Sequence, residues 1–380
     1  MSDSNLTPRI CRVAAVLLVG GQIGTHELPA QGAAARVLAE IDVDAEDLSA
    51  ITALAASHSG LLAVYLRQDG VVRFFDPSGK ALRSVGRKGE GPGEFRRIDA
   101  MGWIGDTLWV SDPSLKRVTQ FRADGSLLRM VALPPNIVES AKSAPPIRYS
   151  APAFKALFPD GSMLFQVSRQ GPPKSGAPRE VMVDARYAVR ASPTGAVQYL
   201  IAEDAPNPCQ IADDNGITGL GICPRPLSAA APDGSRRVGI TSTISSRGVG
   251  FLRVVSLNSR GDTLFNRSYD VRLTPVSEAT RDTVLREVAG AARAKALEFS
   301  QFYPPATSVL VTPSGVVWIG LFAPPGLLRE WRIIDSRGRQ LTSLWLPRSA
   351  TSLAFAPRGV WAVTEASDGS QHIALYAARQ

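Results

Sequence analysis

The clearest pattern in the chain is a turn glycine followed at once by a short alternating apolar run, and it occurs six times. Another apolar run precedes most copies, so each pair predicts a β-hairpin in which glycine supplies the positive φ of the turn. The six copies lie at 57–66, 104–112, 159–167, 232–240, 313–320 and 357–365.

A second repeat follows each of the first five copies and consists of an apolar strand, a polar turn with glycine and a further strand. Two hairpins in series predict a four-stranded up-and-down sheet. The turn glycines Gly79 and Gly125 are 125 − 79 = 46 residues apart, which is the length of a propeller blade. The five copies are 71–86, 118–133, 187–202, 253–268 and 330–346.

The sixth unit lacks its last strand, because the sequence stops at Gln380 soon after the run HIALYAA. The stretch RVLAEIDV (36–43) has no partner of its own. It would complete the sixth sheet, and closing the ring would remove two exposed sheet edges. We therefore expect an all-β fold, a six-bladed β-propeller over 36–380 closed by an N-terminal strand.

One insertion, residues 272–303, breaks the strand rhythm and reads as an amphipathic helix near 277–300. Ser277 is suited to cap its N-terminus. The helix is expected to pack down as a lid or brace, with a recognition helix as the alternative. The apolar positions at helical spacing are Val284, Leu285, Val288 and Leu297.

The long loops all fall on one face of the expected propeller. In up-and-down blades the inter-blade connections and the middle-hairpin loops share a face, and the other turns share the opposite face. Here only the first set is elaborated, so we expect a binding surface there. The long segments of that face are 134–152, 170–180, the loop around Cys209 and Cys223, and 272–303.

The first 30 residues have the layout of a secretory signal peptide. Arg9 and Arg12 precede the apolar run VAAVLLVGG (13–21), and small residues follow at 29–35. That run is too short for a stable anchor. We expect a signal peptide over 1–30 and a periplasmic or secreted protein without a stable membrane span. A disordered or tucked-in N-terminal strand, or an uncleaved tether, is the alternative.

If Cys11 leaves with the signal peptide, Cys209 and Cys223 remain. An even pair in an exported chain predicts a disulfide that closes a local loop. The spacing fits no standard zinc pattern. On the chain-entropy model, closing a loop of about 15 residues with this disulfide would stabilise the folded protein by roughly 3 kcal/mol.

The 380 residues are 44% hydrophobic and carry a formal net charge of +8. This composition is that of a globular protein with a sizeable core. The positive charge suits an anionic partner or simply a solvated basic surface. No block of like charges and no basic helix favours one over the other.

The stretch GRKGEGPGEF (86–95) links the first two expected blades. It lacks the Walker pattern, and no helix follows it, so neither a phosphate loop nor a dinucleotide fingerprint is indicated. We interpret it as a structural connector, with direct ligand contact as the alternative. Glycines allow the tight crossing, a proline stiffens it and an aromatic fills the gap between blades. These residues are Gly89, Gly91, Pro92, Gly93 and Phe95.

That connector, followed by LWVSDPSLKRVTQFRADGSLL, resembles the NHL-type repeat of bacterial exported six-bladed β-propellers. The resemblance covers about 60–130 and implies the fold rather than an activity. The chain departs from the repeat at Leu115 and Lys116, where Asn usually precedes the basic residue. Matching strand positions are Asp112, Arg117, Val118 and Phe121, after the connector glycines and Phe95.

Catalytic motifs are few. His58 is expected in a short turn and His372 at the start of a strand, each with a structural role. No nucleophile elbow and no HExxH motif is present. We therefore predict no catalytic residues, no cofactor and no metal ligands, although a calcium site built from several blades remains open.

Two function classes follow. The first is an exported, non-catalytic binding or scaffold propeller for a protein, glycan or small molecule. The second is a propeller enzyme of the lactonase, lyase or glycan-acting type with a channel metal. Nucleic-acid binding, which the NHL resemblance also allows, is not expected for an exported chain.

Overall fold

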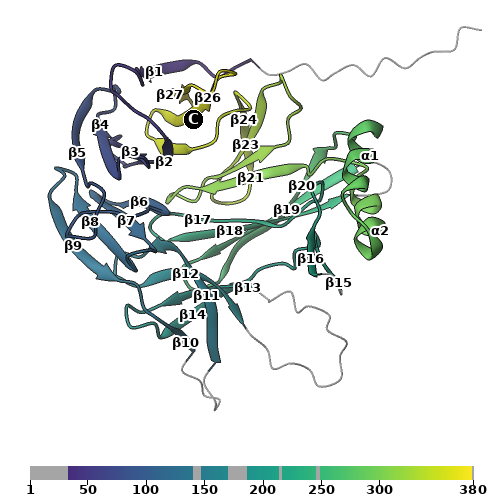
Figure 1. Ribbon diagram of the computed structural model, residues 1–380, viewed down its shortest axis with the longest axis horizontal. Coiled ribbons are helices and arrows are strands. Elements are labelled where there is room, and N and C mark those ends of the chain that lie inside the picture. The colour runs from purple at the N-terminus through teal and green to yellow at the C-terminus, as the bar shows by residue number, and fades with distance from the viewer. Residues whose placement is uncertain (1–32, 140–146, 170–185, 214–215, 245–248, 379–380) are drawn as a thin grey trace, which may run out of the picture. The chain divides into compact units, whose positions relative to one another are not determined.

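The computed structural model describes residues 33–139, 147–169, 186–213, 216–244 and 249–378. Residues 33–380 form one compact unit, and the expected signal peptide over 1–30 lies outside the described residues. Six antiparallel sheets form a ring, which confirms the six-bladed β-propeller (Figure 1).

The first three blades follow one another along the chain. Blade 1 consists of β2 (Ile51–Ala56), β3 (Leu62–Leu66), β4 (Val71–Phe75) and β5 (Ala81–Val85). Blade 2 consists of β6 (Ala100–Ile104), β7 (Thr107–Asp112), β8 (Arg117–Arg122) and β9 (Leu127–Ala132). Blade 3 consists of β10 (Ile137–Glu139), β11 (Ile147–Leu157), β12 (Met163–Arg169), β13 (Arg186–Ala191) and β14 (Val197–Glu203).

The other three blades complete the ring. Blade 4 consists of β17 (Leu227–Ala230), β18 (Arg236–Ile244), β19 (Val249–Asn258) and β20 (Thr263–Arg272). Blade 5 consists of β21 (Ala306–Val311), β22 (Val317–Leu321), β23 (Arg329–Ile334) and β24 (Gln340–Leu346). Blade 6 consists of β25 (Leu353–Ala356), β26 (Gly359–Glu365), β27 (Gln371–Ala377) and β1 (Val37–Ile41).

The N-terminal strand closes the ring as the sequence predicts. β1 pairs antiparallel with β27, with Ile41 opposite Ile373. Ile41 is 4% exposed and packs into the seam between blades 6 and 1, against Trp361 and Leu62. The strand farthest from blade 6 in the sequence therefore supplies its outer edge and part of the core.

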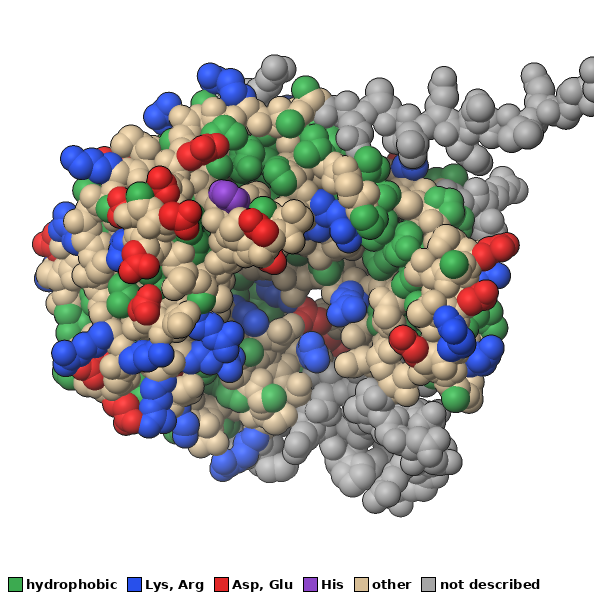
Figure 2. Space-filling model, turned by 45° about the horizontal axis from the view of Figure 1, so that its top comes forward, with side chains coloured by type: hydrophobic (Ala, Val, Ile, Leu, Met, Phe, Trp, Pro, Cys, Tyr) green, Lys and Arg blue, Asp and Glu red, His purple; other side chains and the backbone are tan. Residues whose placement is uncertain are grey.

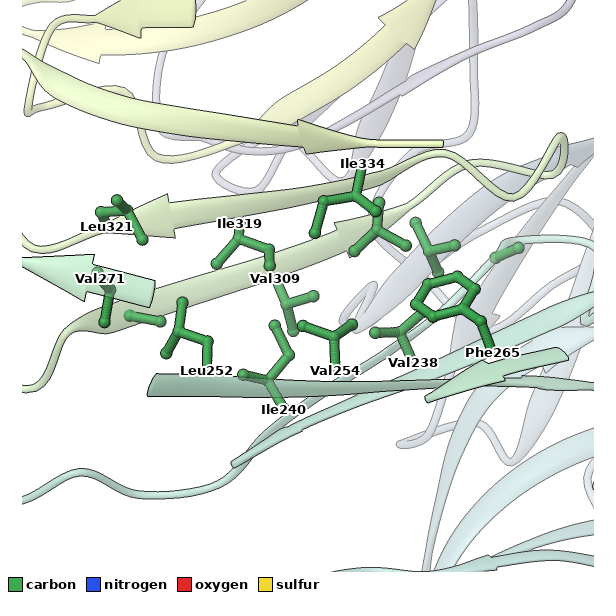
Figure 3. Close-up of a cluster of buried hydrophobic side chains, with 14 residues drawn as sticks. Val238, Ile240, Leu252, Val254, Phe265, Val271, Val309, Ile319, Leu321 and Ile334 are labelled. Atoms are coloured by element: carbon green, nitrogen blue, oxygen red, sulfur yellow. The ribbon is translucent and has the colours of Figure 1, made fainter. Parts of the chain in front are cut away.

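Most of the core lies in the seams between neighbouring blades. Figure 3 shows the seam between blades 4 and 5, where apolar side chains of β18 and β19 meet those of β21 and β22. Both faces of a blade are covered by a neighbour, so its inner strands need apolar residues at consecutive positions. The strand β3 has this pattern and is buried at all of its positions.

The insertion contains two helices where the sequence predicted one near 277–300. The helices are α1 (Glu278–Arg286) and α2 (Gly290–Phe299). Ala289 is extended and Gly290 has φ +58°, a left-handed conformation that ends a continuous helix and that glycine adopts readily. The expected cap is confirmed, because the Ser277 hydroxyl accepts a hydrogen bond from the backbone N–H of Thr280.

The helices pack on the loop that joins blades 3 and 4. Leu285, Val288, Ala292 and Ala296 form one buried cluster with the cysteines of that loop. A short hairpin inside the loop, β15 (Gln210–Asp213) and β16 (Gly216–Gly219), lies beside the helices (Figure 1). Leu297, expected on the apolar face, is 45% exposed, because α2 buries its alanines instead.

Candidate functional site

The seam between blades 3 and 4 is built differently from the others. At its base Phe158, Leu164 and Ile201 of blade 3 pack as a small apolar cluster. Above that cluster the seam opens into a crevice of about 650 Å³. Residues of both blades and of the loop between them line this crevice, which we call the 3/4 crevice.

The crevice exists because of the side chains that β18 turns toward blade 3. In this strand Val238 and Ile240 face blade 5 and are buried in that seam. The alternate positions line the crevice and are Arg237, Gly239 and Thr241. The equivalent positions of β22 on blade 5 are Val317, Ile319 and Leu321, which fill the seam toward blade 4.

Gly239 leaves open space in the crevice wall. A Cβ built on Gly239 would have only Arg237 Nη1 within 4 Å, at 4.0 Å. Its cross-strand partner is Val255, a side chain too short to cover the space. The strand RRVGITSTI carries this signal in the sequence as alternation of Val and Ile with Arg, Gly and Thr. The repeat pattern does not reveal the site, because the turn glycine and the apolar Val238 and Ile240 already match the rhythm of the other hairpins.

The floor of the crevice holds a buried ion pair. Arg237 is 7% exposed and its guanidinium pairs with the carboxylate of Asp204. The Nε2 amide of Gln166 donates to Asp204 Oδ2 at 2.7 Å. Three side chains from three strands or loops thus satisfy one another, which burial of charge requires.

The mouth of the crevice carries three exposed arginines. They come from the start of β13, from the loop before β17 and from β19. Glu203 is the other charged residue there. The three arginines are Arg186, Arg225 and Arg253.

The loop between blades 3 and 4 is held by a disulfide. Cys209 and Cys223 are bonded, with their Cα atoms 5.6 Å apart, as the sequence predicted. Both are buried against α1 and α2. Asn207 and Gln210 on one side of the loop and Arg225 on the other line the crevice. The disulfide and the helices therefore fix one wall of the site.

The glycine-rich connector lies away from the crevice, between blades 1 and 2. Phe95 is fully buried in that seam and meets Phe121 edge to face, with ring centroids 6.1 Å apart. The Gly91 N–H donates to Glu94 Oε2 at 2.8 Å, and the Arg117 guanidinium donates to the Gly91 carbonyl at 2.6 Å. The connector's polar groups bond to one another, while its role as a purely structural element stays a prediction.

The electrostatics of the connector follow from the same contacts. The backbone N–H of Gly91, and then the guanidinium of Arg87, hold the pKa of Glu94 below its ordinary value. Gly89 and Gly93 have positive φ on either side of Gly91. Pro92 between them is exposed.

The two candidate histidines are not brought together. His58 is exposed in the turn between β2 and β3, and His372 is exposed on β27 beside the Ser370 hydroxyl. Among the described residues no three His, Cys, Asp or Glu side chains are grouped for metal binding. The calcium hypothesis remains a prediction.

The central channel is narrowed at its plain face. Pro232, in the turn between β17 and β18, accepts a hydrogen bond from Trp109 Nε1 of blade 2 through its carbonyl at 3.0 Å. Gly102 of blade 2 passes so close that a Cβ would lie 2.5 Å from the Pro232 Cβ. Blades 2 and 4 are not neighbours in the ring, so this contact crosses the channel.

In the view of Figure 2, Lys and Arg side chains lie around a hollow near the middle of the molecule, with acidic side chains among them. In the described part of the chain, no helix has the length and apolar character that crossing a bilayer requires.

Comparison with known proteins gives similarity at the level of the fold. No protein-family model matches the sequence, and no curated protein has significant similarity to it. The chain is similar to hydrazine synthase of Kuenenia stuttgartiensis, at 11% identity and TM-score 0.43, over 88% of this chain and 97% of that one. It is also similar to a protein of Bacteroides fragilis that is assumed to be exported, at 11% identity and TM-score 0.47, over 88% and 91% of the two chains.

A gluconolactonase of Xanthomonas campestris is another similar structure, at 12% identity and TM-score 0.40, over 87% of both chains. At such identities a shared fold does not transfer an activity. The function therefore has to be argued from the crevice itself.

Proposed function

We propose that this protein is an exported, NHL-like β-propeller that binds a small soluble ligand in the 3/4 crevice and does not transform it. The observation that carries the proposal is the Arg, Gly and Thr face of β18, placed where blade 5 has Val, Ile and Leu. A seam that is not filled by apolar side chains buries less apolar surface, which is the main source of stability in a propeller. A ligand-binding role explains why the chain keeps this less stable arrangement.

The size and surroundings of the crevice support the same proposal. Ligand pockets of proteins enclose roughly 300–1,000 Å³ and combine apolar walls with a few oriented polar groups. The crevice has about 650 Å³ and includes Leu227 and Val255 beside Thr241 and Gln210. Its walls belong to two blades and a disulfide-closed loop, so the site is largely formed before a ligand arrives.

Export is supported by the disulfide. Disulfides persist in the periplasm and outside the cell, and they are rare in the reducing cytosol. The bond between Cys209 and Cys223 also braces the loop that forms one wall of the crevice. An exported, preformed site suits the capture of a soluble compound.

The experiment that tests the proposal fills the crevice. The substitution Gly239→Leu places a side chain in the open space beside Val255. Gly239 does not have a positive φ, so leucine can adopt the backbone conformation of this position in β18. Gln340→Leu, at an exposed position of β24, is the matched control. Both variants and the wild type are screened by thermal unfolding and titration calorimetry against neutral and acidic mono- to trisaccharides, lactones and hydroxy acids.

We expect at least one compound to raise the Tm of the wild type and of Gln340→Leu and to leave that of Gly239→Leu unchanged. At a concentration of 100 Kd the stabilisation is about 2.7 kcal/mol. Equal stabilisation of Gly239→Leu, or no stabilisation by any compound, would contradict the proposal. Mass spectrometry of the incubated compounds decides between binding and catalysis, since conversion of a bound lactone or glycan would establish the propeller-enzyme alternative.

A further inference from the structure

We infer that the ligand of the 3/4 crevice is an organic acid, whose carboxylate is bound by Arg186, Arg225 and Arg253 at the mouth. The inference rests on the proposed function and adds the chemical class of the ligand. Four arginines line the crevice against two acids, Glu203 and Asp204, which leaves an excess of 4 − 2 = 2 positive charges.

The floor does not contribute to this excess. Arg237 is neutralised by Asp204, and Gln166 occupies the second carboxylate oxygen. Arg237 is also 7% exposed, so its guanidinium has little surface left for a ligand. The net positive charge therefore lies at the mouth, where a ligand enters.

The three arginines at the mouth have N–H donors that no described residue accepts from. Arg253 donates from Nε to Asn266 Oδ1 at 3.0 Å, which orients its guanidinium. The side chains of Arg186 and Arg225 form no hydrogen bond or ion pair with any residue that the structure describes. Of the two lining acids, Asp204 is paired with Arg237, which leaves Glu203 to offset the charge of the three arginines. Holding three like charges around one opening is unfavourable unless an anion compensates them.

The identity of the cations narrows the ligand chemistry further. All four lining cations are arginine and none is lysine. The planar guanidinium binds carboxylate and phosphate oxygens through two parallel hydrogen bonds. Both head groups share this chemistry, and the experiment below separates them.

The remaining lining side chains indicate the chemistry of the rest of the ligand, beyond its carboxylate. Asn207, Gln210 and Thr241 offer neutral donors and acceptors, and Leu227 and Val255 offer apolar surface. A sugar acid combines a carboxylate, several hydroxyl groups and an apolar ring face. We therefore take acidic sugars as the ligand class.

The test compares a charged probe with its neutral counterpart. Digalacturonate and its dimethyl ester have the same sugar rings and differ in charge. Glucose 6-phosphate tests a phosphate head group. Binding of each is measured by calorimetry at low and moderate salt, with the full-length oxidised protein. The variants are Arg225→Gln with Arg253→Gln, and the control is Arg260→Gln, an exposed arginine in the turn between β19 and β20.

We expect the wild type and the control to bind digalacturonate at least 10-fold more tightly than the ester, with affinity falling as salt rises. The double variant is expected to lose at least 10-fold in affinity for the acid and to keep its affinity for the ester. Tighter binding of glucose 6-phosphate would assign a phosphate ligand and overturn the carboxylate assignment.

Two further outcomes separate this inference from the proposed function. If the acid and the ester bind equally and Gly239→Leu abolishes both, the crevice binds a ligand but does not select anions. The inference then fails and the proposed function stands. If digalacturonate binding survives Gly239→Leu, or none of the three probes binds, the anion is not held in the crevice and the inference fails. Binding of a different compound in the broader screen would still support the proposed function.

Discussion

The buried carboxylate of Asp112 accepts four backbone hydrogen bonds, and its removal gives a well-defined stability prediction. Asp112 is fully buried at the end of β7. Its Oδ1 accepts the N–H groups of Ser114 and Leu115 at 2.9 and 3.1 Å. Its Oδ2 accepts those of Arg96 and Arg97 at 2.7 and 3.0 Å. One carboxylate thus joins the connector from blade 1 to a turn of blade 2.

The magnitude follows from these four bonds. A hydrogen bond to a charged group contributes about 1.5–3 kcal/mol, and a buried N–H left unpaired costs a similar amount. Asp112→Ala removes all four acceptors, and we expect a loss of about 3–5 kcal/mol, less than the sum because some N–H groups regain water. Asp112→Asn keeps the Oδ1 bonds and turns an amide donor toward two donors, so we expect about 2–3 kcal/mol.

The assay is urea unfolding at pH 7 with the disulfide intact, followed by tryptophan fluorescence. Trp103 and Trp109 lie in the same blade and report its unfolding. Asp106→Asn is the control, because Asp106 is an exposed aspartate of the adjacent turn. A loss below about 1 kcal/mol for Asp112→Ala would refute the reasoning, because it would mean that the four contacts contribute no more than an exposed pair.

Three other predictions concern the disulfide, the half-buried phenol of Tyr269 and the floor of the crevice. Replacing Cys209 and Cys223 by Ala should cost about 2–4 kcal/mol in urea unfolding and weaken ligand binding, since the loop forms a wall of the site. Burial raises the pKa of Tyr269 from 10.0 to about 12, so its contribution to stability is present below pH 10 and is lost between about pH 10 and 12. Tyr269→Phe should remove that loss in alkaline unfolding. Asp204→Ala should cost about 3–5 kcal/mol by leaving Arg237 buried and unpaired.

Each of these three predictions is contradicted by a specific result. An unchanged ligand affinity in the double Cys variant would show that the loop wall forms without the disulfide. An alkaline transition that is the same in Tyr269→Phe would mean that another group titrates there. Full stability of Asp204→Ala would mean that Arg237 reaches solvent, and the variant Arg237→Met with Asp204→Leu, expected to be near neutral, is its control.

The sequence by itself determined the fold of this protein. Alternating apolar runs after turn glycines recur six times along the chain. Each run forms a strand as predicted, because its pattern depends on only a few neighbouring residues. The missing sixth outer strand and the unused stretch 36–43 predicted the closure by β1. The pairing of Cys209 with Cys223 followed because only two cysteines remained after the first 30 residues.

Some local features escaped the pattern. The insertion was expected as one helix, and the left-handed Gly290 divides it in two. The apolar spacing placed Leu297 on the buried face, and packing on the disulfide loop chose Ala292 and Ala296 instead. Helix periodicity identifies an apolar stripe, but the partner surface decides which of its residues are buried.

Only the tertiary structure decided the candidate site. The crevice needs Gln166 of blade 3, Asp204 of the following loop and Arg237 of blade 4 in contact, and no short-range pattern connects them. These three side chains meet only because of the orientation of blade 4 relative to blade 3, and because one particular face of β18 points toward blade 3. The site is hard to find in the sequence because the blades follow similar patterns. Gly239 stands in β18 where β22 has Ile319, and a single glycine of this kind does not disturb the alternating pattern of a strand. The repeat therefore encodes the scaffold, while the function resides in the seam where one blade departs from it.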